Sequence, residues 1–284
     1  MLMTFMHGLK AQVMQKTGYT AFPSEFVASR RVDVYLPPDY PAKAPYRVLY
    51  MHDGQNLSDP ATSMRSMPWK ADFSLMQLMK KGEIPPCILV GIWNTSARYQ
   101  EYAPEPAFTH AGDSLKLKIK EHYGEMPYSD RYLRFITEEL KPFIDREYLT
   151  NPDAQSTAIA GSSMGGLISL YALCKYPGVF GSAACLSIHW PILTKVNDKS
   201  MFHSFSRWLE ENLPKDGEHL IYLDQGTETL DSLYAPYMNE IRQLFIRAAF
   251  PAESYSIRVF EGAAHEESAW AERFPEVLRY LYRR

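Results

Sequence analysis

The stretch S-T-A-I-A-G-S-S-M-G-G-L-I-S-L-Y-A-L, residues 156–173, decides the fold because it places a serine between a strand and a helix. Residues 157–160 are apolar or β-branched, as in a buried strand, and apolar residues recur at helical spacing from residue 167 onward. Ser163 therefore falls on the turn, between two glycines that let strand and helix approach closely. A G-x-S-x-G turn in this context is typical of a nucleophile elbow. The alternative is a glycine-rich turn with no catalytic role. The presence of a suitable histidine and acid elsewhere in the sequence would favour the nucleophile elbow.

Composition places the chain among ordinary soluble globular proteins. It has 284 residues, of which 46% are apolar and 22% charged, and no linker interrupts it, so we predict one domain over residues 1–284. The net charge of −3 is spread over both signs and gives no reason to expect nucleic acid or an anionic membrane as partner. No run reaches the roughly 18 apolar residues of a membrane span, and no signal peptide is evident. We therefore predict a cytoplasmic protein.

Metal and cofactor chemistry find little support in the sequence. The three cysteines, Cys87, Cys174 and Cys185, each lie in an apolar run and are predicted to be buried free thiols. His52 and Asp53 are neighbours of metal-ligand type, but no third ligand follows at suitable spacing. We therefore expect no metal site and no cofactor.

Strand and helix patterns alternate along the chain. We predict strands over residues 31–36, 46–51, 87–93, 157–160, 179–188, 220–223 and 255–260, with helical periodicity between them and at the C-terminus. Residues 31–36 alternate polar and apolar, as in a half-exposed strand near a sheet edge, whereas residues 87–93 are apolar throughout, as in a strand covered on both faces. This alternation predicts an α/β fold with a mostly parallel sheet and helices on both faces.

Residues 94–129 interrupt this alternation with a long, mixed stretch that contains three prolines and many polar residues. Stretches of this length are usually functional insertions or disordered, so we expect an insertion near the active site. A helix should begin near Asp130, and Pro142 should bend or restart it.

A base and an acid for Ser163 should lie on loops after the carboxyl ends of strands. His265 follows the last predicted strand and precedes the terminal helix, which matches the chain order serine, acid, histidine. Three carboxylates follow the strand at 220–223 and could orient this histidine: Asp224, Glu228 and Asp231. Their spacing in the sequence does not separate them.

An acyl-transfer site also needs N–H donors for the developing oxyanion. One donor is expected from Met164, the residue after the nucleophile, and the other from the loop after an early strand. The string His52-Asp53-Gly54-Gln55 occupies that loop, where Gly54 would let the chain approach the substrate. A plain strand-ending turn is the alternative, since Asp-Gly is common in turns.

Taken together, these strings resemble the Putative esterase family of α/β-hydrolases, which includes esterase D, enterochelin and salmochelin esterases, and feruloyl or acetylxylan esterases. The resemblance runs from about residue 30 to the C-terminus. Its strings are Y-M-H-D-G-Q-N at 50–56, V-G-I-W-N-T and E-Y-A-P within 90–104, E-E-L-K-P-F-I-D at 138–145, G-S-S-M-G-G at 161–166, D-Q-G-T-E-T-L-D at 224–231 and G-A-A-H-E at 262–266.

The resemblance implies an α/β-hydrolase fold, with Ser163 as nucleophile and His265 as general base. Met164 and either Gly54 or Gln55 would be the oxyanion donors. Relatives with the G-T-x-T-L-D string keep its final aspartate, which favours Asp231 as the acid, with Glu228 as the alternative. Other branches place the acid at the position of Thr229 in this chain.

The resemblance further implies a substrate cleft in which five side chains take part, although each could instead be structural: Asn94, Arg98, Tyr99, Tyr102 and Trp190. Large anionic siderophores would favour a more basic cleft than residues 94–132 provide, and relatives acting on formylglutathione carry a different oxyanion string. We expect hydrolysis of a carboxylic ester, with a small-molecule ester as substrate, through an acyl-serine. An acyltransferase or a non-catalytic binding module is the alternative. The oligomeric state and the choice among aryl, sugar-acetate, feruloyl and siderophore esters stay open.

Overall fold

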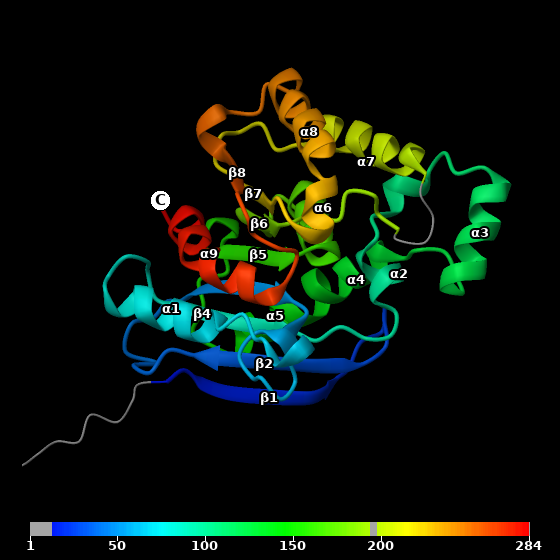
Figure 1. The fold of residues 1–284 in the computed structure, drawn as a ribbon. Coiled ribbons are helices and arrows are strands. Elements are labelled where there is room, and N and C mark those ends of the chain that lie inside the picture. Colours follow the sequence, from blue (N-terminus) through cyan, green and yellow to red (C-terminus); the bar gives the residue numbers. More distant parts are fainter. Residues whose placement is uncertain (1–12, 194–197, 284) are drawn as a thin grey trace, which may run out of the picture.

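One eight-stranded sheet organises the molecule in the computed structural model, which describes residues 13–193 and 198–283 (Figure 1). The strands are β1 (Gln15–Phe22), β2 (Arg30–Leu36), β3 (Arg47–His52), β4 (Cys87–Ile92), β5 (Thr157–Ser162), β6 (Ser182–Leu186), β7 (Leu220–Gly226) and β8 (Tyr255–Phe260). Their order across the sheet is β1-β2-β4-β3-β5-β6-β7-β8. From β4 to β8 all neighbours are parallel, whereas β2 pairs antiparallel with both β1 and β4. The predicted α/β class with a mostly parallel sheet is confirmed.

Helices cover both faces of this sheet (Figure 1). They are α1 (Ala71–Lys80), α2 (Arg98–Tyr102), α3 (Asp113–Tyr123), α4 (Ser129–Arg134), α5 (Lys141–Glu147), α6 (Met164–Lys175), α7 (Lys199–Asn212), α8 (Ala235–Arg247) and α9 (Glu267–Leu281). Helices α1 and α9 pack on one face, where Leu75 and Phe274 belong to the same apolar cluster. Helices α4 to α8 contribute to the larger cluster on the other face, which includes Leu133, Leu170 and Phe205. This arrangement puts the carboxyl ends of the parallel strands at one edge of the sheet.

The antiparallel end of the sheet differs from the sequence-based expectation. β1 forms the outer edge, although its residues are mostly exposed and no strand was predicted there. β2 was expected to be half-exposed, but Val32, Asp33 and Val34 are all buried: the two valines belong to the larger apolar cluster, and Asp33 contacts Arg31 and Trp93. The alternating pattern of β2 therefore reflects a buried Asp33, which accepts hydrogen bonds from Arg31 and Trp93, and not a solvent face.

The stretch over residues 94–129 is largely helical, not an irregular loop. It contains α2, a short 3-10 helix (Glu105–Phe108) and α3. Further along, a π-helical segment (Phe135–Leu140) joins α4 to α5, and Pro142 lies in the first turn of α5. The backbone is helical at both Leu140 and Lys141, so the expected bend or restart at this proline stays a prediction. The boundaries of the insertion and the single domain over residues 1–284 stay predictions. Over residues 13–193 and 198–283, every helix is too short or too polar to cross a membrane.

Candidate active site

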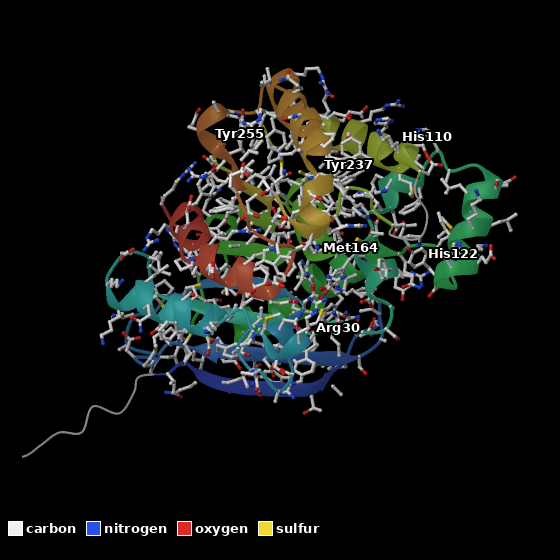
Figure 2. All side chains as sticks on the ribbon, viewed as in Figure 1. Arg30, His110, His122, Met164, Tyr237 and Tyr255 are labelled. Atoms are coloured by element: carbon white, nitrogen blue, oxygen red, sulfur yellow. The ribbon has the colours of Figure 1, made fainter. Side chains whose placement is uncertain are left out.

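Ser163 stands on a sharp turn between β5 and α6. Its backbone has φ 57° and ψ −122°, and its N–H donates to the carbonyl oxygen of Leu186 at 2.9 Å. A Cβ atom at Gly161 would lie 2.7 Å from the backbone carbon of Gly165, so glycine is required where strand and helix cross. A positive φ is uncommon for residues other than glycine and persists where the surroundings impose it. Met164 follows at the start of α6, in the interior of the molecule (Figure 2).

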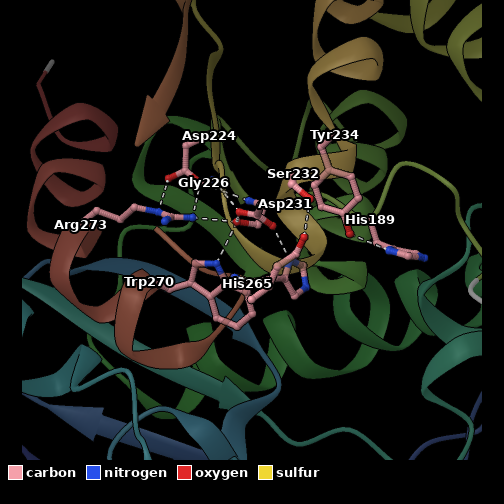
Figure 3. Close-up of polar contacts among 11 residues, drawn as sticks. His189, Asp224, Gly226, Asp231, Ser232, Tyr234, His265, Trp270 and Arg273 are labelled. Atoms are coloured by element: carbon pink, nitrogen blue, oxygen red, sulfur yellow. Dashed lines mark hydrogen bonds and ion pairs between the residues drawn. The ribbon is translucent and has the colours of Figure 1, made fainter. Parts of the chain in front are cut away.

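His265 lies in the loop after β8 and contacts Asp231. Its Nδ1 atom is 2.5 Å from Oδ1 of Asp231, a side chain with no exposed surface (Figure 3). The other carboxylate oxygen, Oδ2, accepts hydrogen bonds from the N–H of Gly226 at 2.5 Å and the hydroxyl of Ser187 at 2.6 Å. Burial alone would raise the pKa of Asp231, but the hydrogen bonds from His265, Ser187 and Gly226 more than offset it and lower this pKa below its ordinary value.

The two other candidate acids lie elsewhere. Glu228 is exposed, although it is only three residues from Asp231. Asp224 is fully buried at the end of β7, where its two oxygens accept hydrogen bonds from Nε and Nη2 of Arg273 at 3.0 and 2.9 Å. Of the three carboxylates considered, the structure brings Asp231 to His265.

A pocket of about 200 Å³ opens beside Ser163 and is also lined by His265. The other side chains on its wall are mostly polar or charged and include Asp53, Asn56, Arg65, Asn94, Arg98 and Glu267. A larger hollow of about 390 Å³ lies between residues 37–43 and α1, but it contains neither Ser163 nor His265. The smaller pocket is therefore the candidate active site. Among the described residues, no group of three His, Cys, Asp or Glu side chains is arranged to hold a metal ion.

The turn after β3 forms a second wall of the pocket. Asp53 has a left-handed backbone, with φ 55° and ψ 47°, and leads into a 3-10 turn (Gly54–Asn56). A Cβ atom at Gly54 would lie 2.7 Å from the backbone carbon of Gly91, so this turn packs directly on β4. Gly54 and Gln55 lie between Asp53 and Asn56, which line the pocket, and Met164 directly follows Ser163, so these residues lie on the turns where the sequence places the oxyanion donors. Their assignment as donors stays a prediction.

Arg98 and Asn94 reach the pocket from the stretch after β4 and hold Asp53. The guanidinium of Arg98 donates to both oxygens of Asp53, at 2.8 and 2.7 Å, and the amide of Asn94 donates at 2.6 Å. Burial would raise the pKa of Asp53, but Arg98 and Asn94 more than offset it, so the pKa is lowered. Asp53 is therefore an anion whose charge is matched by Arg98.

The aromatic residues of the expected cleft lie deeper. Tyr99 is partly buried and packs against the ring of Tyr123. Tyr102 has no exposed surface and packs against His52, and Trp190 is equally buried against Phe202. The structure places these last two side chains in the core and not on the pocket wall, because large rings gain more from full burial than from a polar pocket.

The sequence-based reasoning missed several residues that support the site. Ser187 donates a hydrogen bond to Asp231, and Trp270 and Arg273 donate hydrogen bonds to the hydroxyl oxygen of Ser187. A signal was available for two of them: Trp270 and Arg273 lie three residues apart on the apolar side of the terminal helix, where an arginine needs a buried partner. Ser187 carries no such signal.

An α/β-hydrolase fold with a serine elbow, a histidine and a buried aspartate defines a class of enzymes, and comparison with known proteins identifies the family. The model of the family described as "Putative esterase" matches residues 24–281, so the chain belongs to that family and the resemblance is confirmed. The protein is therefore a hydrolase that acts on ester bonds.

Similar proteins include two from Bacillus subtilis (strain 168). "Uncharacterized protein YbbA" is 24% identical over 262 residues, which are 89% of this chain and 93% of that protein. "Ferri-bacillibactin esterase BesA" is 29% identical over 237 residues, 79% of this chain and 75% of that protein. A solved structure described as a ferulic acid esterase matches with a TM-score of 0.67 at 20% identity, over 96% of this chain and 98% of the other. This last similarity shows a shared fold.

Proposed function

We propose that this esterase hydrolyses carboxylic esters through a covalent acyl-serine, with Ser163 as nucleophile, His265 as general base and Asp231 as the acid that orients it. The observation that carries the proposal is the contact between His265 Nδ1 and Asp231, in a pocket that also contains Ser163. Because Asp231 is an anion with a lowered pKa, Nδ1 of His265 carries the hydrogen it shares. The other ring nitrogen, Nε2, is then left to take the proton of Ser163.

The reaction follows in two halves. Ser163 Oγ attacks the ester carbonyl as its proton passes to His265, and the negative oxygen that forms is stabilised by the N–H of Met164 and that of Gly54 or Gln55. His265 then gives its proton to the departing alcohol, which leaves an acyl group on Ser163. Water attacks this acyl-serine with His265 again as base, which releases the acid and restores the serine.

The pocket wall favours a compact, neutral ester. Arg98 is neutralised by Asp53, and the other cation of the wall, Arg65, lies 3.9 Å from Glu266. A large polyanionic substrate, such as the siderophores considered from the sequence, would require cations without matching carboxylates, and the pairing of Arg98 with Asp53 argues against such a substrate. A volume of about 200 Å³ suits a small acyl group such as acetyl.

Turnover of p-nitrophenyl acetate tests the proposal. Ser163→Ala should reduce kcat at least roughly 1,000-fold, since it removes the attacking atom, whereas Ser114→Ala, at an exposed serine of α3, should keep most of the activity. A fluorophosphonate should add its mass to the peptide that contains Ser163. Equal turnover by wild type and Ser163→Ala would refute the acyl-serine mechanism.

A further inference from the structure

The hydroxyl group of Ser187 is buried, and its hydrogen has one available acceptor. It follows β6 with a left-handed backbone (φ 44°) and has no exposed surface. Nε1 of Trp270 lies 3.0 Å from its oxygen and Nη2 of Arg273 lies 2.8 Å away. Indole and guanidinium N–H groups only donate, so the oxygen of Ser187 accepts from both. Its own hydrogen is left for Oδ2 of Asp231, at 2.6 Å.

Arg273 is itself held in place by Asp224. The guanidinium donates to both oxygens of this carboxylate, and both side chains are almost fully buried (Figure 3). Asp224 also accepts a hydrogen bond from the backbone N–H of Ser187 at 3.2 Å. A buried ion pair gives little net stability, because desolvation of the two charges offsets their attraction. The geometry of the pair is better explained by the hydrogen bond that Arg273 donates to the hydroxyl oxygen of Ser187.

We propose that Ser187 and Arg273 are positioning residues of the catalytic site: Arg273 fixes the hydroxyl of Ser187, which in turn fixes the carboxylate of Asp231 against His265. This inference rests on the proposed function of Asp231 and His265. Asp224, two residues before the end of β7, has the role of holding Arg273.

These contacts prevent rotation of the Asp231 carboxylate. Oδ2 is occupied by the hydroxyl of Ser187 and the N–H of Gly226, so the plane of the carboxylate is fixed and Oδ1 faces His265. Without the hydroxyl of Ser187, the N–H of Gly226 alone would hold Oδ2. The carboxylate could then turn, and the imidazole would lose its orientation toward Ser163. This loss would slow the chemical step and leave substrate binding nearly unchanged.

Steady-state kinetics with p-nitrophenyl acetate test this arrangement. Ser187→Ala and Arg273→Met should each lower kcat roughly 10- to 100-fold, the range expected for one hydrogen bond to a charged group, with little change in KM. Arg273→Lys keeps a cationic donor and should recover part of the loss. The double variant Ser187→Ala/Arg273→Met should be no slower than the slower single variant, because Arg273 acts through Ser187.

The control is Arg279→Met, the same substitution on the same helix, where Arg279 pairs at the surface with Glu83. It should leave kcat and KM unchanged. All rates are measured below the unfolding temperature of each variant, and Ser187→Ala with Arg273→Lys carry the test if Arg273→Met does not fold. Unchanged kcat in the folded variants, or losses that multiply in the double variant, would overturn the inference. Failure of the proposed function is a separate result: wild-type enzyme and Ser163→Ala would then turn over p-nitrophenyl acetate at the same rate.

Discussion

His265 Nδ1 and Asp231 Oδ1 lie 2.5 Å apart, although 34 positions separate the two residues in the chain. The contact joins the loop after β8 to a 3-10 turn (Thr229–Leu233) that follows β7, and the backbone N–H of His265 adds a hydrogen bond to the hydroxyl of Thr229 at 2.8 Å. Two contacts between the same two loops fix the histidine from its backbone and from its ring. The orientation of His265 therefore depends on this turn as much as on β8.

Asp231→Asn should lower kcat for p-nitrophenyl acetate about 10,000-fold, because an amide in place of the carboxylate can stabilise the wrong tautomer of His265 and cannot stabilise its charged form. Glu228→Gln is the matched control on the same turn and should keep wild-type kcat, since Glu228 is exposed. A collapse of activity in Glu228→Gln alone would transfer the role of the acid to Glu228.

Gly161→Ala should damage both stability and activity. The new Cβ atom would lie 2.7 Å from the backbone of Gly165, and relief of that overlap should cost about 1–3 kcal/mol in the free energy of unfolding. A shift of Ser163 by about 1 Å should lower kcat about 100-fold. Gly178→Ala is the control, because a Cβ atom at Gly178 has no heavy atom of another part of the described chain within 4 Å. Urea unfolding and kcat check both variants, and equal effects at the two glycines would contradict the crowding argument.

Glu101→Gln should lower the free energy of unfolding by about 3 kcal/mol. Glu101 lies in α2 and forms two hydrogen bonds with Arg30 of β2, and both side chains are buried, so the neutral variant leaves Arg30 as a buried charge without its counter-ion. Glu138→Gln is the control, because Glu138 pairs with Arg134 in solvent and its loss should leave the free energy of unfolding nearly unchanged. Urea denaturation measures both, and a loss below 1 kcal/mol for Glu101→Gln would mean that α2 is held by other contacts.

Acid should destabilise the protein through His52. Burial lowers the pKa of His52 to about 3 from its ordinary value of 6.5, so the unfolded chain takes up this proton first as the pH falls. The contribution of His52 to the free energy of unfolding is complete above about pH 6.5 and declines by about 1.4 kcal/mol per pH unit down to about pH 3. Between pH 7 and pH 5 the protein should therefore lose about 2 kcal/mol of stability through this residue. Burial lowers the pKa of His189 to about 4 and adds a similar amount over that interval.

His52→Gln should therefore reduce the difference in unfolding free energy between pH 7 and pH 5 by about 2 kcal/mol, and His189→Gln should do the same. The double variant should lose both contributions. Urea unfolding at the two pH values checks this expectation. A pH difference that stays as large in His52→Gln as in wild type would contradict the neutral, buried state of His52.

The strands that could be predicted from sequence are those whose burial shows in the residues themselves. Cys87–Ile92 is apolar throughout and forms a central strand, as expected. β1 could not be found this way, because its exposed, mostly polar residues become a strand only by pairing with β2. Tyr102 and Trp190 illustrate the same limit, since their sequence neighbours do not reveal how deeply the rings are buried.

Some residues of the candidate site could likewise be predicted from local sequence patterns, whereas others could not. The elbow at Ser163 and the loop of His265 follow from local patterns, namely glycine spacing and position after a strand. The choice between Glu228 and Asp231 depends on which way a short turn directs each carboxylate, and three residues of spacing do not encode that direction. The hydrogen bonds that connect Arg273 to Asp231 through Ser187 join three segments that are distant in the sequence, so only the folded structure reveals them.

The backbone of Ser163, with φ 57° and ψ −122°, also bears on how such an enzyme evolves. Glycine reaches this conformation with far less strain, so Ser163→Gly would relieve part of a cost of about 1–3 kcal/mol while it removes the proposed nucleophile. A duplicated gene copy freed from the need for turnover would thus gain stability from one substitution at this codon.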